Sequence, residues 1–163
     1  RVLSTTLVGS GLVWGAMIDR ANAYTMDRAN GATMLTIPMG HSLDAVCACL
    51  GEIVQVSATM AVQTSDFLNV ESGEHGIKTS PDQVAFTGEL ASGATIACHY
   101  RAGVSRGTNL LWEINGSDGD IVVTAAGGHM QILDLAVSGG RGEASAVEPL
   151  ALPEGLRTAP AGA

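Results

Sequence analysis

The second half of the chain constrains the fold most, because short runs rich in β-branched residues alternate there with turn signals. The runs that begin at Glu52 are EIVQVSATMAV, QVAFTGELA, ATIACHYR, NLLWEING, DIVVTAA and MQILDLAV. Turn signals separate several of them, namely SG at 92–93, NGSDG at 115–119 and GG at 127–128. Because links this short join antiparallel neighbours, the pattern predicts about six antiparallel strands.

A first strand and a helix are predicted before these runs. RVLSTTLV at the N-terminus is rich in β-branched residues and predicts a strand, whereas residues 10–29 have no clean period and predict an irregular excursion with one helical turn. After that, apolar side chains recur at i, i+3, i+4 and i+7, the spacing of a core-facing helix stripe. These residues are Leu43, Val46, Cys47 and Leu50.

Gly51 predicts the end of this helix, but its start stays open between two alternatives. Thr36, just before Pro38, is a possible cap. The helix could instead begin near Gly31 and kink at Pro38.

One strand, a helical segment and six strands together predict an α+β domain. We expect a large, mainly antiparallel mixed β-sheet with the helical segment packed on one face. The other face would lie bare in a monomer, so we expect it to be apolar and to form an oligomer interface. Residues 1–151 are expected to make one domain, and the Pro/Ala/Gly-rich residues 152–163 a flexible tail.

Composition excludes several classes of function. The chain has 163 residues and 46% hydrophobic residues, which fits one packed domain. Its net charge of −8 would repel a phosphate backbone, so no direct nucleic-acid binding is expected. No run of about 18 uninterrupted apolar residues predicts a membrane span. Three cysteines without a disulfide framework, Cys47, Cys49 and Cys98, are expected to be small buried hydrophobes, which favours a reducing cytoplasmic compartment.

Two further patterns predict little chemistry. Gly9-x-Gly11 follows the first strand, but Gly15 is one place too late for a dinucleotide fingerprint and no βαβ unit follows. We therefore expect no cofactor pyrophosphate site in this chain. The remaining histidines lack the spacing of metal ligands, so no metal site is expected. They are His75, His99 and His129.

TIPMGHSLD, residues 36–44, is the stretch in which chemistry is most plausible, and two interpretations stay open. His41 and Asp44 fall on the side of the helix opposite the apolar stripe, among small residues that leave room for a ligand. The first turn of a helix favours a neutral histidine, which suits a general acid or base. The alternative is a structural histidine paired with Asp44 at i+3.

At these residues the chain resembles a known family. NGATMLTIPMGHSLDAVCACLGEIVQVSA is similar to the signature stretch of the C-terminal domain of the glucose–fructose oxidoreductase, inositol dehydrogenase and MocA-like family. DQVAFTGELASGATIACHYRAGVSRGTNLLWEINGSDGDIVV is similar to the sheet of that family. The form TIPMGHSLD looks closest to the branch typified by the fungal galactose-regulon repressor. The resemblance covers residues 1–149.

This resemblance implies an N-terminal Rossmann domain that binds NAD or NADP and lies outside this sequence, and a C-terminal domain that shapes the substrate pocket and the oligomer contact. His41 matches the family's active-site histidine, and the candidate substrate-binding residues are Ile37, His41 and Tyr24. The family's usual Asp, four residues before that histidine, is Ile37 here, and its EKP lysine belongs to the other domain. Asp44 matches a family Asp that we interpret as structural.

The expected function is therefore that of the substrate-binding and oligomerisation domain of an NAD(P)-dependent oxidoreductase acting on a sugar or polyol-like substrate. The alternative is a non-catalytic, cofactor-sensing transcriptional regulator, which Ile37 favours, whereas His41 favours the enzyme. In either case we expect the chain alone to be inactive.

Overall fold

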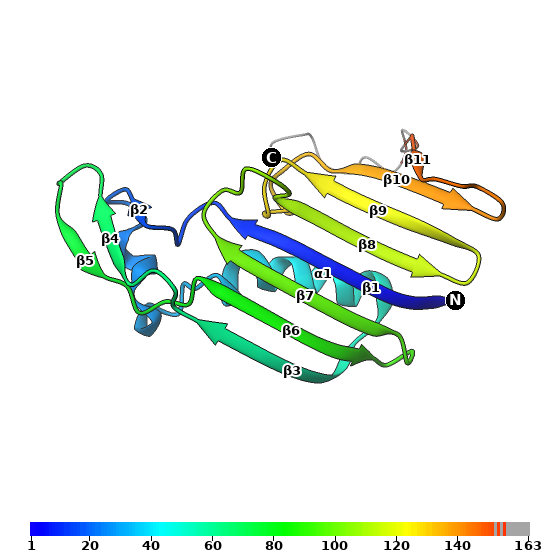
Figure 1. Ribbon diagram of the computed structural model, residues 1–163, viewed down its shortest axis with the longest axis horizontal. Coiled ribbons are helices and arrows are strands. Elements are labelled where there is room, and N and C mark those ends of the chain that lie inside the picture. The colour runs from blue at the N-terminus through cyan, green and yellow to red at the C-terminus, as the bar shows by residue number, and fades with distance from the viewer. Residues whose placement is uncertain (152, 154, 156–163) are drawn as a thin grey trace.

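The main element of the computed structural model is an eight-stranded sheet, within the described residues 1–151, 153 and 155 (Figure 1). Its order is β11-β10-β9-β8-β1-β7-β6-β3. The strands are β1 (Val2–Gly11), β3 (Ile53–Ala61), β6 (Gln83–Leu90), β7 (Thr95–Ala102), β8 (Leu110–Gly116), β9 (Gly119–Ala125), β10 (Ala136–Arg141) and β11 (Glu148–Pro149). Neighbours are antiparallel except β1 and β7, which run parallel. The predicted mixed, mainly antiparallel sheet is confirmed, and the predicted tail lies almost wholly outside the described residues.

A smaller three-stranded sheet, which the sequence did not predict, extends from one end of the main sheet (Figure 1). Its strands are β2 (Met17–Ile18), β4 (Asp66–Asn69) and β5 (His75–Ile77). The helical elements are η1 (Ala23–Met26), η2 (Arg28–Asn30), η3 (Leu35–Met39) and α1 (Gly40–Leu50). Of these strands only β2 lies within residues 10–29, and two residues are too few to show a period of two, so that segment was predicted only as irregular.

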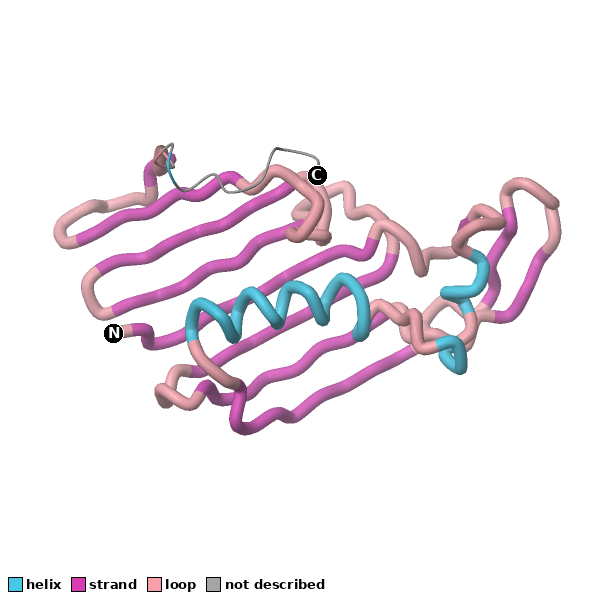
Figure 2. The backbone as a smooth tube through the Cα atoms, turned by 180° about the vertical axis from the view of Figure 1, so that it is seen from behind, coloured by secondary structure: helices cyan, strands magenta, loops and turns pink. Residues whose placement is uncertain are grey.

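The helix α1 crosses one face of the main sheet, as Figure 2 shows from behind. Helical backbone already begins at Leu35, and Pro38 lies within it. Of the two predicted starts, the helix that kinks at Pro38 is therefore closer to the structure than the helix capped by Thr36. Pro38 has no N–H to donate, and the chain opens there into a wider turn in which the N–H of Met39 donates to the carbonyl of Met34 at 3.1 Å. Thr36 is no cap of α1, because its hydroxyl donates to the carbonyl of Gly31.

The core lies between α1 and the sheet, and successive residues of the strands point alternately into it and away from it. Val84, Phe86 and Leu90 of β6 are buried, whereas Thr87 and Glu89 are exposed on the other face. Large side chains from the neighbouring strands and from α1 complete the core, and they include Leu7, Val46, Ile96, Cys98, Tyr100, Leu110 and Trp112.

The face of the sheet away from α1, here called the open face, is polar, so the prediction of an apolar face was wrong. Strand register places small and polar side chains in rows across it. One row is Ser57, Thr87, Ala97, Thr6, Glu113, Val122 and Ser138. Threonine favours strands as strongly as valine does, but its hydroxyl keeps the surface polar. A strand-rich sequence with one helix therefore need not leave a bare apolar face.

Two other details differ from the prediction. MQILDLAV is mostly a loop, and the last long strand is the glycine-rich AVSGGR of β10. Cys98 is buried and Cys47 is half-buried, but Cys49 is exposed, so it was wrongly predicted as a buried hydrophobe.

By length and composition alone, one described segment, Arg28–Leu50, could cross a membrane. It is not one straight helix, because Gly31 has φ of +70° and Pro38 interrupts the regular turns that follow. Ser42 and Val46 within it are buried against the sheet, as expected for the core helix of a folded domain.

Candidate functional site

The candidate site lies at the start of α1, near the end of β1. His41 is the second residue of α1 and is exposed, whereas its neighbour Ser42 is fully buried against the sheet. The helix phase therefore turns His41 away from the core, as the stripe predicted. Asp44 is also exposed, and no ion pair joins it to His41 in the part of the chain that the structure describes.

A buried hydrogen-bond chain fixes this turn of α1 to the sheet and to the loop after β9. The hydroxyls of Ser42 and Tyr100 are 2.5 Å apart, and the Tyr100 hydroxyl donates to the carbonyl of Gly128 at 3.1 Å. Since Tyr100 donates to Gly128, Ser42 must donate to Tyr100. Burial raises the pKa of Tyr100 to about 12, so the phenol keeps its proton and remains a donor.

The hydrogen bonds from Ser42 through Tyr100 to Gly128 bring His129, the next residue, to the same end of the sheet as His41. His129 is 7% exposed, and its ring stacks on Trp14 with centroids 6.1 Å apart and planes 18° apart. Its Nε2 accepts the N–H of Leu12 at 3.3 Å. Burial, and then the charge of nearby His41, lower the pKa of His129, so the ring is held neutral.

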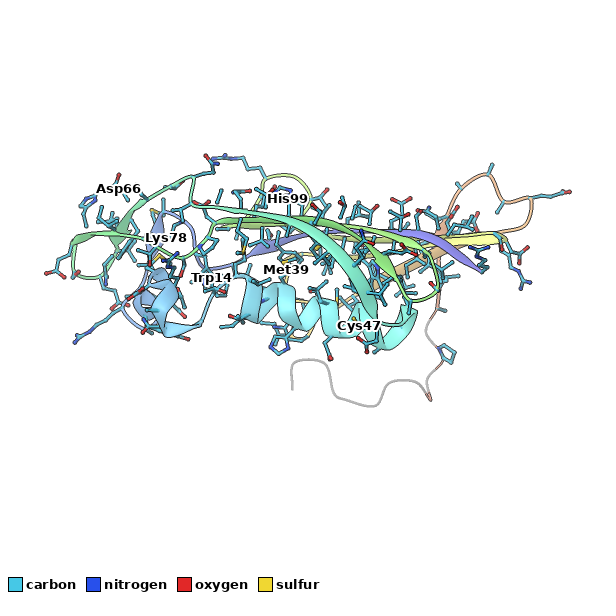
Figure 3. The ribbon with its side chains drawn as sticks, turned by 90° about the horizontal axis from the view of Figure 1, so that it is seen from below. Trp14, Met39, Cys47, Asp66, Lys78 and His99 are labelled. Atoms are coloured by element: carbon cyan, nitrogen blue, oxygen red, sulfur yellow. The ribbon has the colours of Figure 1, made fainter. Side chains whose placement is uncertain are left out.

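Trp14 supports this arrangement in an unusual backbone conformation, with φ of +63°. A bulky residue adopts a positive φ only where its surroundings enforce it. Its indole N–H donates to the carbonyl of Ala32 at 2.9 Å, and its own carbonyl accepts from the Lys78 ammonium at 2.8 Å. Figure 3 shows Trp14 and Lys78 at the same end of the molecule, away from Cys47 at the far end of α1.

The Lys78 ammonium is buried, and it needs the charge of Asp82. The two groups are 3.1 Å apart, and the Asp82 carboxylate also accepts the N–H groups of Gln63 and Thr64, each at 2.7 Å. Burial raises the pKa of Asp82, but these N–H donors and Lys78 outweigh burial, and the net pKa is lowered. The ion pair thereby holds the backbone of Trp14 in place through Lys78.

The structure places the other sequence-predicted residues less centrally. Ile37 is half-buried in η3 and packs against the core. Tyr24 is 53% exposed in η1, and its carbonyl accepts hydrogen bonds from the side chain of Asn30 and the N–H of Asp27. Neither residue contacts His41 through a recorded hydrogen bond in the described chain.

Several residues of the site were missed from the sequence: Trp14, Ser42, Tyr100 and His129. Tyr100 falls on the buried face of β7, so its hydroxyl had to find a partner, and this was the available signal. His129 was considered only as a metal ligand. Within the described residues, no group of three or more His, Cys, Asp or Glu side chains is placed to hold a metal ion.

The glycines after the first strand are explained by packing. A Cβ on Gly9 would collide with the ring of Tyr100, and one on Gly11 would lie 2.9 Å from the indole of Trp14. The turn after β1 leads to Trp14 and β2, not into a helix, so no helix N-terminus faces these glycines. A cavity of about 560 Å³ lies at the other end of β1, around Val2 and Gly116.

Comparisons with known proteins agree on one family of folds. A family model described as Gal80p, C-terminal domain, matches residues 1–125. A search of the curated proteins finds no match.

Solved structures give the same result. A super-repressor mutant of Gal80p from Saccharomyces cerevisiae is 20% identical with a TM-score of 0.82 over 94% of this chain and 42% of that one. Gal80p from Kluyveromyces lactis is 23% identical, with a TM-score of 0.77 over 94% of this chain and 38% of that one. Levoglucosan dehydrogenase in complex with NADH and levoglucosan is 17% identical, with a TM-score of 0.69 over 92% of this chain and 39% of that one. The chain thus spans about two-fifths of the length of each.

Proposed function

Because this chain belongs to the family of the Gal80p C-terminal domain, we propose that it is the substrate-binding and oligomerisation domain of an NAD(P)-dependent oxidoreductase acting on a sugar or polyol-like alcohol. One observation carries the proposal: His41 presents an exposed ring beside a buried, neutral His129 at a rigidly built end of the sheet. Solved relatives of similar fold include an NAD-binding oxidoreductase and a levoglucosan dehydrogenase with NADH.

In this proposal the two halves of the reaction belong to different domains. NAD or NADP would supply the hydride chemistry, and a Rossmann domain outside this sequence would hold it, because β1 leads to Trp14 and β2 and not directly into a helix. His41 accepts the proton of the substrate hydroxyl when the alcohol is oxidised and returns it in the reverse direction. Ser42, through Tyr100 and Gly128, positions the turn that carries His41.

The second candidate is a cofactor-sensing regulator that binds a ligand and does not turn it over. Ile37 favours it, because the carboxylate expected four residues before the histidine is replaced by a hydrocarbon side chain. The similarity to Gal80p from Kluyveromyces lactis, a transcriptional regulator, supports the same alternative.

The decisive experiment is a dehydrogenase assay on the full-length protein with NAD and NADP, using levoglucosan, L-sorbose and a set of polyols. If the protein is an enzyme, His41→Ala lowers turnover by about 10²–10⁴-fold with cofactor binding nearly unchanged. His75→Ala, at an exposed position of β5, is the matched control and should keep full activity. Absence of turnover in the wild type, with NADH still bound, favours the regulator.

We further propose that the open face forms a homo-oligomer contact and that the protein works in the cytoplasm. The contact would be built from hydrogen bonds between Ser, Thr, Glu113 and Arg101 side chains, since the face is polar. Three free cysteines support a reducing compartment. Sedimentation of the wild type against a Thr6→Arg variant tests the contact: a wild-type monomer at high concentration would refute it.

A further inference from the structure

The second histidine of the site has a free ring nitrogen. Because Nε2 of His129 accepts the N–H of Leu12, the neutral ring must carry its proton on Nδ1. No hydrogen bond to Nδ1 is recorded within the described residues. Yet none of the buried side-chain nitrogen and oxygen atoms in that part of the chain lacks a partner. Nδ1 is therefore not sealed in the core, and its N–H reaches the surface.

The ring is also fixed in place, which a ligand-binding donor requires. Stacking on Trp14 fixes the plane of the His129 ring, and the hydrogen bond from the N–H of Leu12 fixes how the ring is turned within that plane. The backbone before it is fixed as well, because Gly128 donates its N–H to the carbonyl of Ser10 at 3.1 Å and accepts from Tyr100. Because these contacts already fix the donor, it loses little conformational entropy when a ligand binds.

His41 and His129 belong to two elements that a hydrogen-bond chain joins. The Ser42–Tyr100–Gly128 hydrogen bonds tie the residue after His41 to the residue before His129. The charge of His41 is also close enough to act on His129. His41 is exposed on α1, whereas His129 is 7% exposed in the loop after β9.

We propose that His129 is a ligand-binding residue of this site, donating from its Nδ1–H to a hydroxyl oxygen of a neutral, polyhydroxylated ligand while His41 contacts a second hydroxyl. This inference rests on the function proposed above and adds a specificity-determining group to it. A neutral donor matches a hydroxyl oxygen, whereas an anion would find no fixed positive charge on His129. The overall charge of −8 also disfavours an anionic ligand.

The test uses the full-length protein labelled with ¹⁵N at histidine, and its first readout needs no mutation. Long-range ¹H–¹⁵N spectra report the tautomer of each ring. We expect His129 to be the Nδ1–H tautomer, and its Nδ1 signal to shift when levoglucosan or L-sorbose is added, together with the signals of His41. His129 in the Nε2–H form, or sugar shifts at His41 without any at His129, would overturn the inference.

Affinity measurements supply the second readout. His129→Gln keeps an oxygen that can accept from Leu12 and removes the aromatic Nδ1–H, and it should weaken sugar binding about 3- to 10-fold. His99→Gln is the matched control, because His99 lies on the open face and bonds to Gln83; Figure 3 shows it on the side of the sheet away from α1. Equal affinity of wild type and His129→Gln, with both folded, would also overturn the inference.

The outcomes separate this inference from the proposed function. Sugar shifts at both histidines without any turnover of NAD or NADP would support the inference and contradict the enzyme. Turnover that persists with unchanged affinity in His129→Gln would support the enzyme and contradict the inference. Sugar that perturbs neither histidine would contradict both.

Discussion

Ser42 on the helix and Tyr100 on the sheet, 58 residues apart in the chain, share a 2.5 Å hydrogen bond in the core. Through it the first turn of α1 is fixed to the central strands. Tyr100→Phe leaves the hydroxyl of Ser42 and the carbonyl of Gly128 without this partner, so we expect a loss of about 1–3 kcal/mol in the free energy of unfolding. Denaturant titration measures it.

Controls for this prediction come from the same hydrogen bond and from the surface. Ser42→Ala with Tyr100→Phe should be less than additive, because the two residues share one interaction. Ser57→Ala, at an exposed position of β3, should change the free energy of unfolding by no more than about 0.5 kcal/mol. Strict additivity would show that the two hydroxyls act independently.

Gly128 allows the loop that carries His129 to lie against β1. A Cβ at this position would collide with the backbone of Ser10, which cannot move without breaking the ladder. We expect Gly128→Ala to unfold the chain or displace the loop, seen as loss of cooperative thermal unfolding. Gly142→Ala is the control: its φ of +61° makes alanine strained, but nothing lies within 4 Å, so the cost should be about 1 kcal/mol.

The buried pair of Lys78 and Asp82 gives a pH dependence at the acid end. The net pKa of Asp82 is lowered from its ordinary 3.8, since N–H donors and Lys78 outweigh the effect of burial. The carboxylate therefore contributes its full stabilisation above about pH 4 and loses it as the pH falls through the folded-state pKa. Removing one partner, as in Asp82→Asn, should cost about 3–5 kcal/mol by leaving the ammonium buried and unpaired.

The control for that prediction is the exposed pair of Arg141 and Asp118. Asp118→Asn should cost at most about 1 kcal/mol, because solvent screens the pair. Urea titrations from pH 7 to pH 2 on the three proteins check both expectations. An acid transition that is unchanged in Asp82→Asn would rule out Asp82 as its source.

His129 gives a second, milder pH dependence. Burial and the charge of His41 lower its pKa below the ordinary 6.5. A lowered pKa favours the neutral ring in the folded state, so the stabilisation is complete above pH 6.5 and is lost as the pH falls through the folded-state value. The free energy of unfolding cannot change by more than about 1.4 kcal/mol per pH unit when one proton is bound. Thermal unfolding between pH 7.5 and 5 should show this pH dependence in the wild type and not in His129→Gln.

The strand β3 lies at the edge of the main sheet with no charged residue along it. Val54, Val56 and Met60 are 62%, 58% and 56% exposed. Such an edge pairs readily with other chains, and natural edges are often protected by lysine. We expect Val56→Lys to lower aggregation of this chain, measured by light scattering on refolding, with little change in stability. Thr59→Ser, on the same edge, should leave aggregation unchanged.

The sequence was most informative where a pattern repeats. Six long strands follow from runs of β-branched residues between turn signals, and α1 follows from apolar side chains at helical spacing. The position of β10 could not be predicted in this way, because its glycines carry no apolar signal: Gly139 packs against the side chain of Leu150, and Gly140 packs against the backbone of Ala146. The preceding MQILDL is apolar, yet it forms the loop that follows His129.

The site was predicted only in part, for a physical reason. The exposure of His41 follows from the helix stripe, which is local. Its neighbours Trp14, Tyr100 and His129 come from three distant segments, and their contacts depend on strand register and on a positive φ that no local pattern encodes. In such sequences, a tyrosine on the buried face of a strand and a histidine next to glycine are the features that indicate site residues of this kind.

The place of β1 in the middle of the sheet has a consequence for the order of assembly. Leu7 pairs with Cys98 of β7 on one side and with Trp112 of β8 on the other, so β1 is synthesised long before both of its neighbours. Until residues 110–116 have left the ribosome, β1 keeps one unpaired edge, and without β1 the strands form two separate half-sheets. Long-range closure of this kind is slow. During that delay the β1 of a second copy fits the same gap, so strand exchange between copies is the misassembly that this topology favours.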